Sequence, residues 1–179
     1  MIRVLLADDH AIVRSGIRRM IEQIPNMEVV GEAENGPQVL HFLNSTSIDL
    51  LLIDVTMPDF EPIETISNIR RLYPDLKILV VSAYDDDYYV KGLLNAGVNG
   101  YHMKDQPLND LRVAIERVMA GEHWISHTLI NKLVEKPVPA SAVNPLTTRQ
   151  RTLLRYLQQG LDNKTIADNL GLSIKTVEN

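Results

Sequence analysis

The protein has 179 residues, of which 45% are hydrophobic and 23% charged, so it can form one ordinary domain and a smaller one. It contains no cysteine, which excludes disulfides and thiol chemistry. The N-terminus lacks the pattern of a signal peptide, and no apolar run approaches the roughly 18 residues of a membrane span. We therefore expect a cytoplasmic protein that has no membrane partner.

Charge is distributed unevenly along the chain, whose overall net charge is −5. Residues 146–179 contain five basic and three acidic residues, a net charge of +2, whereas residues 1–145 contain 13 basic and 20 acidic residues, a net charge of −7. Such a division indicates two modules with different partners, although +2 alone is a weak signal for nucleic-acid binding.

Strand-like and helix-like segments alternate through residue 120. In chain order they are a strand at 2–7, a helix at 11–24, a strand at 27–33, a helix at 38–44, a strand at 50–53, a helix at 63–72, a strand at 77–81, a helix at 86–96, a strand at 100–103 and a helix at 107–120. Most of the strands are continuous apolar runs, which suits strands buried on both faces, and the helices have one apolar face. This alternation predicts an α/β fold with a parallel, doubly wound sheet of five strands.

The pattern changes after residue 121. Residues 136–145, KPVPASAVNP, contain three prolines and indicate a semi-extended linker. The chain from Leu146 onward is helical in pattern, with helices near 148–159 and 163–170 and a third that begins near Ser173. The predicted domains are therefore an α/β domain at 1–122, a linker with a short helix at 123–145 and a small all-α domain at 146–179.

Polar residues follow four of the predicted strands: Asp8 and Asp9 the first, Asp54 the third, Ser82 the fourth and Lys104 the fifth. Because parallel strands end at the same edge of a sheet, we expect these side chains to lie close together. Crowded carboxylates repel one another, and a hard divalent cation such as Mg²⁺ relieves the repulsion. Asp54 then suits a nucleophile that accepts a phosphoryl group, whose oxygens Lys104, the cation and the Ser82 hydroxyl stabilise.

Residues 1–122 resemble the receiver domain of bacterial two-component response regulators. The shared features are DD after the first strand, DVTMP after the third, VVS at the end of the fourth and GYHMK at the fifth. The resemblance implies a flavodoxin-like sheet with the strand order 2-1-3-4-5. It also implies that Asp54 accepts a phosphoryl group from a histidine kinase, and that the protein forms a homodimer when phosphorylated.

The same resemblance implies roles for single residues. The Mg²⁺ ligands would be Asp9, Asp54, the backbone carbonyl of Thr56 and, through water, Asp8. Ser82 and Tyr101 would form a switch pair, in which Ser82 moves toward the phosphoryl group and the Tyr101 ring turns inward. The chain departs from the family at Pro62, near the place where a glycine usually follows the MP pair. We expect the loop beside Asp54 to be stiffer, so the lifetime of the phosphoryl group does not carry over from the family.

The tail resembles the helix-turn-helix of the NarL/FixJ, or LuxR-type, regulators through LTTRQ and GLDNKTIADNLGLSIKTVEN. In that family the third helix enters the major groove of DNA. The residues expected to contact DNA are Arg149, Lys164, Lys175 and Thr176. The chain stops within this helix, at Asn179, so we expect it to be a truncated form of a longer regulator; a native C-terminus at Asn179, found by mass spectrometry, would contradict this.

Three other functions remain open at this point. A phosphotransferase of the haloacid dehalogenase type also uses a strand-end aspartate, but it normally has a second acid two residues later, where this chain has Thr56. A flavodoxin would need a phosphate-binding loop after the first strand, where Asp8 and Asp9 would repel phosphate. A regulator that acts through protein contacts without DNA binding is the third alternative.

Other titratable groups are interpreted as structural. We take His10 to be a helix-start residue rather than a metal ligand, and Asp85, Asp86 and Asp87 to be favourable charges at the start of a helix. His123 and His127 have a spacing that zinc sites use, but the segment between them, Trp124-Ile125-Ser126, suggests a turn, so we expect no zinc there.

Overall fold

The computed structural model describes residues 1–130. By contacts the chain divides into two units, Met1–Glu135 and Lys136–Asn179. The predicted helix-turn-helix, with Arg149, Lys164, Lys175 and Thr176, lies outside the described residues. Within residues 1–130, no helix has both the length and the apolar character required to cross a membrane.

Six strands and five helices alternate along the described part of the chain. They are β1 (Ile2–Ala7), α1 (Ala11–Ile21), β2 (Met27–Ala33), α2 (Gly36–Ser45), β3 (Leu50–Ile53), α3 (Pro62–Leu72), β4 (Lys77–Ser82), α4 (Asp87–Asn95), β5 (Gly100–Met103), α5 (Leu108–Met119) and β6 (Trp124–Ile125). The strands form one sheet in the order β2-β1-β3-β4-β5-β6, and every neighbouring pair is parallel. The predicted α/β fold and the order 2-1-3-4-5 are confirmed.

The sixth strand corrects the sequence analysis, which took residues 124–126 as a turn. Trp124 pairs with Gly100 and Ile125 with Tyr101, along the outer side of β5. Two residues are too few to show a strand period, so the sequence did not reveal this strand. Because β6 belongs to the sheet, the α/β unit continues past the predicted boundary at residue 122.

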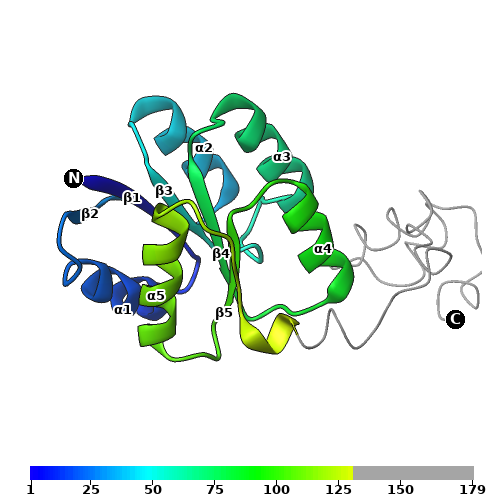
Figure 1. Ribbon diagram of the computed structural model, residues 1–179. Helices are drawn as coiled ribbons and strands as arrows, with labels where there is room; N and C mark the ends of the chain where they lie inside the picture. Colours follow the sequence, from blue (N-terminus) through cyan, green and yellow to red (C-terminus); the bar gives the residue numbers. More distant parts are fainter. Residues whose placement is uncertain (131–179) are drawn as a thin grey trace, which may run out of the picture. The chain divides into compact units, whose positions relative to one another are not determined.

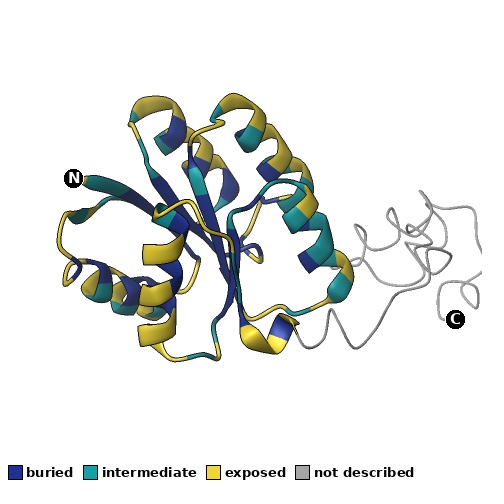
Figure 2. Ribbon diagram, viewed as in Figure 1, coloured by how far each residue is buried: buried dark blue, intermediate teal, exposed yellow. Residues whose placement is uncertain are grey.

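Helices cover both faces of the sheet (Figure 1). One apolar core lies between the sheet and α2, α3 and α4, and a second lies between the sheet and α1 and α5. All four residues of β3 are fully buried, and the central strands appear dark blue along most of their length in Figure 2. Burial on both faces explains why this strand has no polar alternation.

Helix starts follow local sequence signals. Asn35 caps α2 by accepting a hydrogen bond from the Gln38 amide at 3.0 Å. Asp86 caps α4 by accepting hydrogen bonds from the amides of the residues that follow, as expected for acids at a helix start. Pro62 occupies the first turn of α3, where its missing amide proton costs no helical hydrogen bond.

Candidate functional site

The carboxyl ends of β1, β3 and β5 bring two carboxylates and one ammonium group together. The Lys104 Nζ atom lies 2.6 Å from Asp8 Oδ2 and 2.7 Å from Asp54 Oδ2. The two aspartates are buried, with only 2% and 1% of their surface exposed, so each charge depends on groups of the protein for its stabilisation. The predicted meeting of these residues at one edge of the sheet is confirmed.

Main-chain hydrogen bonds extend the strand pairing to the residues of the site. The amide of Asp8 donates to the Ala33 carbonyl at 3.0 Å, and the amide of Asp54 donates to the Ala7 carbonyl at 2.8 Å. The amide of Lys104 donates to the carbonyl of Ser82 at 2.9 Å. Each side chain therefore starts from a position fixed by the sheet, although it stands just beyond the end of its strand.

Thr56 holds the Asp54 carboxylate from the other side. Its amide donates to Asp54 Oδ1 at 3.0 Å, and its hydroxyl lies 2.9 Å from each carboxylate oxygen. A haloacid dehalogenase would have a second acid at this position, and here a hydroxyl donor replaces it. The contact with Thr56 orients Asp54 without adding another negative charge.

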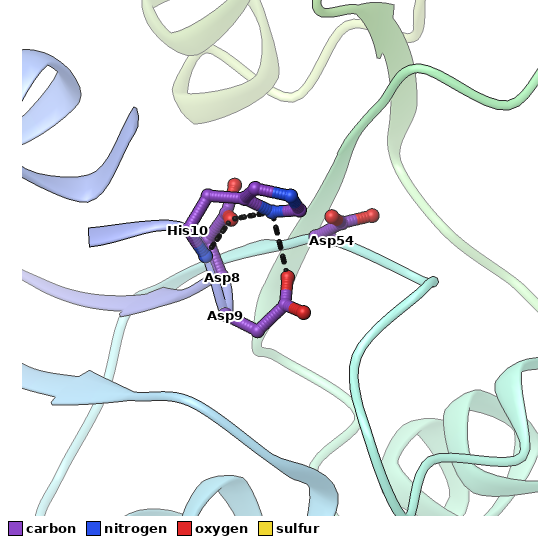
Figure 3. Close-up of side chains that lie close together, drawn as sticks. All are labelled: Asp8, Asp9, His10 and Asp54. Atoms are coloured by element: carbon purple, nitrogen blue, oxygen red, sulfur yellow. Dashed lines mark hydrogen bonds and ion pairs between the residues drawn. The ribbon is translucent and has the colours of Figure 1, made fainter. Parts of the chain in front are cut away.

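Asp9 and His10 complete the cluster, and Figure 3 shows them close to Asp8 and Asp54. One ligand atom from each of Asp8, Asp9, His10 and Asp54 lies within 4.8 Å of the others. His10 Nδ1 is 2.7 Å from Asp9 Oδ1 and 3.2 Å from Asp8 Oδ1. His10 stands at a helix start, as predicted, and is the N-cap residue of α1, but its side chain makes no capping hydrogen bond.

The electrostatics of Lys104 result from two opposing effects. Burial lowers the pKa of the lysine, whereas its hydrogen bonds to Asp54 and Asp8 raise it, and the net direction is upward. The ammonium group therefore stays charged at neutral pH. With Asp8, Asp9 and Asp54 ionised, one lysine does not balance the negative charge, so the cluster favours a further cation.

The oxygen donors suit a magnesium ion. The three aspartates supply carboxylate oxygens within the small volume described above, and hard divalent ions prefer such ligands. Asp9 has 33% of its side chain exposed, so it can be reached from solvent, whereas Asp8 and Asp54 form the buried wall of the site. This donor set can hold a metal ion.

Ser82, the last residue of β4, and Tyr101, in β5, lie close together beside the acids at the carboxyl edge of the sheet. The Tyr101 ring is fully buried, and its hydroxyl donates to the Tyr84 carbonyl at 2.5 Å. Burial raises the pKa of Tyr101 to about 12, although a hydrogen bond with Ser82 lowers it and the charge of Asp54 raises it. The Ser82 hydroxyl accepts a hydrogen bond from the Tyr84 amide at 3.1 Å. Tyr84 thus links both residues through its backbone, which the sequence analysis did not anticipate.

Arg14 is a second residue that the sequence analysis missed. Its guanidinium group is buried, donates to the backbone carbonyl of Asp8 at 2.5 Å, and pairs with Glu32 and Glu34 on the segment at the end of β2. These contacts fix the turn that carries Asp8. The signal for Arg14 was its place on the apolar stripe of α1, three residues before the buried Ile17.

Comparisons with known protein families identify both parts of the chain. Residues 4–116 match the response regulator receiver domain, and residues 144–179 match the family described as bacterial regulatory proteins, luxR family. The second match lies outside the described residues. It covers the region in which the sequence analysis placed the helix-turn-helix.

Individual relatives agree with these family matches. The chain is 35% identical to the nitrate/nitrite response regulator protein NarL of Escherichia coli, over 98% of this chain and 83% of the relative. It is 36% identical to the response regulator GacA of Pseudomonas protegens, over 99% of this chain and 84% of that protein. The chain also resembles a solved structure of RcsB from Salmonella enterica serovar Typhimurium, which is bound to a promoter in the presence of the phosphomimetic BeF₃⁻. The two sequences are 30% identical and the TM-score is 0.69. The match covers 99% of this chain and 87% of the RcsB chain.

The two family matches together cover most of the chain, from the α/β unit to the last residue. The chain therefore belongs to the two-component response regulators that join a receiver domain to a LuxR-type DNA-binding domain.

Proposed function

We propose that Asp54 is the phosphoryl acceptor of this regulator and that a histidine kinase is the donor. The observation that carries the proposal is the buried Asp54 carboxylate, which Lys104 and Thr56 hold at the open edge of the sheet. In the transfer, an Asp54 oxygen forms a bond to phosphorus. The bond between phosphorus and the donor breaks, and the leaving group keeps the electron pair.

Lys104 and the metal site stabilise the negative charge that this step brings in. A magnesium ion held by Asp9, Asp54, the Thr56 carbonyl and, through water, Asp8 would neutralise charge on the phosphoryl oxygens. The Lys104 ammonium group, now paired with Asp54 Oδ2, remains beside the same carboxylate when that carboxylate becomes an acyl phosphate. The receiver thereby catalyses its own phosphorylation and later hydrolysis, without acting on a separate substrate.

Ser82 and Tyr101 transmit the effect of Asp54 phosphorylation to the segment that carries Tyr84. The Ser82 hydroxyl turns from the Tyr84 amide to donate to a phosphoryl oxygen, and the segment that carries Tyr84 shifts with it. Tyr101 is already turned inward, because its ring is fully buried and its hydroxyl is bonded to the Tyr84 carbonyl. The contact favours the inward position of the ring before phosphorylation.

The output we propose is control of transcription by a homodimer that binds DNA through the LuxR-type unit. Support comes from the RcsB structure on promoter DNA and from the family match at residues 144–179. Within that unit, Arg149, Lys164, Lys175 and Thr176 are the proposed DNA contacts. A gel-shift assay on the phosphorylated protein separates this output from regulation by protein contacts alone.

Phosphate incorporation from radiolabelled acetyl phosphate with Mg²⁺ tests the acceptor. Asp54→Asn is expected to abolish incorporation, and Asp75→Asn, at an exposed aspartate between α3 and β4, is expected to leave it unchanged. Sizing with and without beryllofluoride then tests dimer formation on the same preparations. Normal incorporation into the Asp54→Asn protein would refute the proposal.

A further inference from the structure

His10 stands at the start of a helix but does not stabilise it in the usual way. It is the N-cap residue of α1, and its side chain forms no capping hydrogen bond. Histidine is also not among the residues that N-cap positions favour, which are asparagine, aspartate, serine and threonine. The residue type at this position therefore has no evident role in starting the helix.

The imidazole is instead directed at the acidic cluster. Figure 3 shows the ring beside Asp8 and above Asp9, with Asp54 to its right. The Nδ1 atom is 2.7 Å from Asp9 Oδ1 and 3.2 Å from Asp8 Oδ1. The backbone amide of His10 also donates to Asp8 Oδ1 at 2.8 Å, so the main chain holds the residue beside the cluster. A ring nitrogen thus shares one small volume with three carboxylates.

The spacing of these atoms fits coordination of one ion. With metal–ligand distances of about 2.1 Å, neighbouring ligand atoms lie about 3.0 Å apart in an octahedral site and about 3.4 Å apart in a tetrahedral one, and opposite ligands about 4.2 Å apart. The two Nδ1–carboxylate distances fall near the shorter values, and the whole set lies within 4.8 Å. Only small side-chain adjustments separate the present arrangement from a set of four ligands.

A nitrogen ligand changes which ion such a site prefers. Mg²⁺ favours oxygen ligands, whereas imidazole suits divalent ions of the first transition series, including zinc. Nδ1 can offer its lone pair when the ring proton resides on Nε2, and the side chain is 63% exposed, so water can reach the ring. The combination of three carboxylates and one imidazole therefore differs in chemistry from a site made of oxygens alone.

We propose that His10 is a metal ligand, that it binds through Nδ1 together with Asp9 and Asp54, and that it shifts the preference of this site from Mg²⁺ toward divalent transition-metal ions. The inference rests on the same acidic cluster as the proposed function. It adds a ligand that determines metal selectivity, and it is independent of whether a kinase delivers the phosphoryl group.

Calorimetric titration of the unphosphorylated, full-length chain with Zn²⁺ and with Mg²⁺ tests this role. In His10→Ala the affinity for Zn²⁺ is expected to fall by about tenfold or more, and the affinity for Mg²⁺ by a clearly smaller factor. His127→Ala, which removes an exposed histidine that follows β6 and does not belong to the cluster, is the matched control and is expected to bind both ions as the wild type does. NMR of protein labelled with ¹⁵N-histidine should show that Zn²⁺ shifts the Nδ1 signal of His10.

A second variant separates coordination from folding. His10→Asn places a favoured N-cap residue at the start of α1 and offers an oxygen in place of the nitrogen. It is expected to fold, to retain Mg²⁺ and to lose the preference for Zn²⁺. Equal losses for the two ions, an unchanged affinity for Zn²⁺ in both variants, or a Zn²⁺-induced shift at another histidine would overturn the proposal.

Incorporation of phosphate from acetyl phosphate into the wild-type protein, measured with Mg²⁺, distinguishes the two proposals. If phosphate is incorporated but the His10 variants keep the wild-type preference for Zn²⁺, only the proposed role of His10 is contradicted. Absence of incorporation contradicts the role of Asp54 and leaves the zinc measurement to decide the role of His10.

Discussion

Replacing Lys104 with methionine is expected to destabilise the folded protein by about 3–5 kcal/mol at neutral pH. Methionine keeps an unbranched apolar stem of similar length, so the substitution removes mainly the ammonium charge. What remains are two carboxylates, Asp8 and Asp54, that are almost completely buried and face each other without the cation that now separates them.

The magnitude follows from the contacts of the ammonium group. At 2.6 and 2.7 Å, and with an effective dielectric constant of about 20, the attraction to each carboxylate is about 6 kcal/mol. Removing the charge also removes the cost of burying it, which is several kcal/mol for one ion, and water can enter because 15% of the lysine side chain is exposed. Both effects reduce the net loss well below the summed attraction, so we expect the value of about 3–5 kcal/mol that is typical when one partner of a buried ion pair is removed.

Urea unfolding, monitored by tryptophan fluorescence, measures the loss of stability in the α/β unit that contains Lys104. The single tryptophan, Trp124, lies in β6 and therefore reports on the sheet. Lys91→Met, on α4, is the control and is expected to change the free energy of unfolding by no more than about 0.5 kcal/mol.

A double-mutant cycle with Asp54→Asn tests the cause of the effect. Lys104→Met leaves two buried carboxylates without their cation, and Asp54→Asn has already removed one of them. In the Asp54→Asn background, Lys104→Met should therefore lower the free energy of unfolding by about 2 kcal/mol less than it does in the wild type. Equal losses of stability in the two backgrounds would show that Lys104 stabilises the protein by packing rather than by charge, and the electrostatic reasoning would be wrong.

Two further substitutions, one of them with a matched control, probe residues outside the acidic cluster. Burial lowers the pKa of His102 from its ordinary value of 6.5. Below pH 6.5 the unfolded chain therefore binds a proton that the folded chain does not. The free energy of unfolding then falls with decreasing pH, by up to about 1.4 kcal/mol per pH unit. His102→Leu should remove this component, and parallel urea midpoints for the two proteins between pH 7.5 and 5.5 would contradict it. Gly36→Ala would place a Cβ atom 2.1 Å from the backbone oxygen of Asp59, in the loop that follows Asp54, and is expected to cost about 1–3 kcal/mol in urea unfolding. Gly16→Ala, in α1 with free space around it, should instead be neutral or stabilising, so equal losses in both alanine variants would refute the steric explanation.

Sequence alone was sufficient for the first five strands, their order in the sheet and the five helices of the described unit. Continuous apolar runs such as Leu50 to Ile53 identify strands buried on both faces, and apolar residues at helical spacing identify the covering helices. Because parallel strands end at one edge, the positions of Asp8, Asp54 and Lys104 in the chain already predict that they meet. Local sequence also indicated that Asp85, Asp86 and Asp87 stand at the start of a helix, and the structure adds that Asp86 is its cap.

Tertiary structure decided the features that depend on contacts between distant segments. β6 exists because the outer side of β5 accepts two residues that have no strand period of their own. Tyr101 is held inward by a backbone carbonyl 17 residues earlier. Arg14 is held beside Asp8 by Glu32, near the end of β2, and by Glu34, just after it. His10 faces the acids instead of capping its helix, and no periodicity encodes that choice. The sequence thus determined which chemical groups come to the edge of the sheet, whereas packing determined their orientation, because a side chain's direction depends on neighbours that only the folded chain supplies.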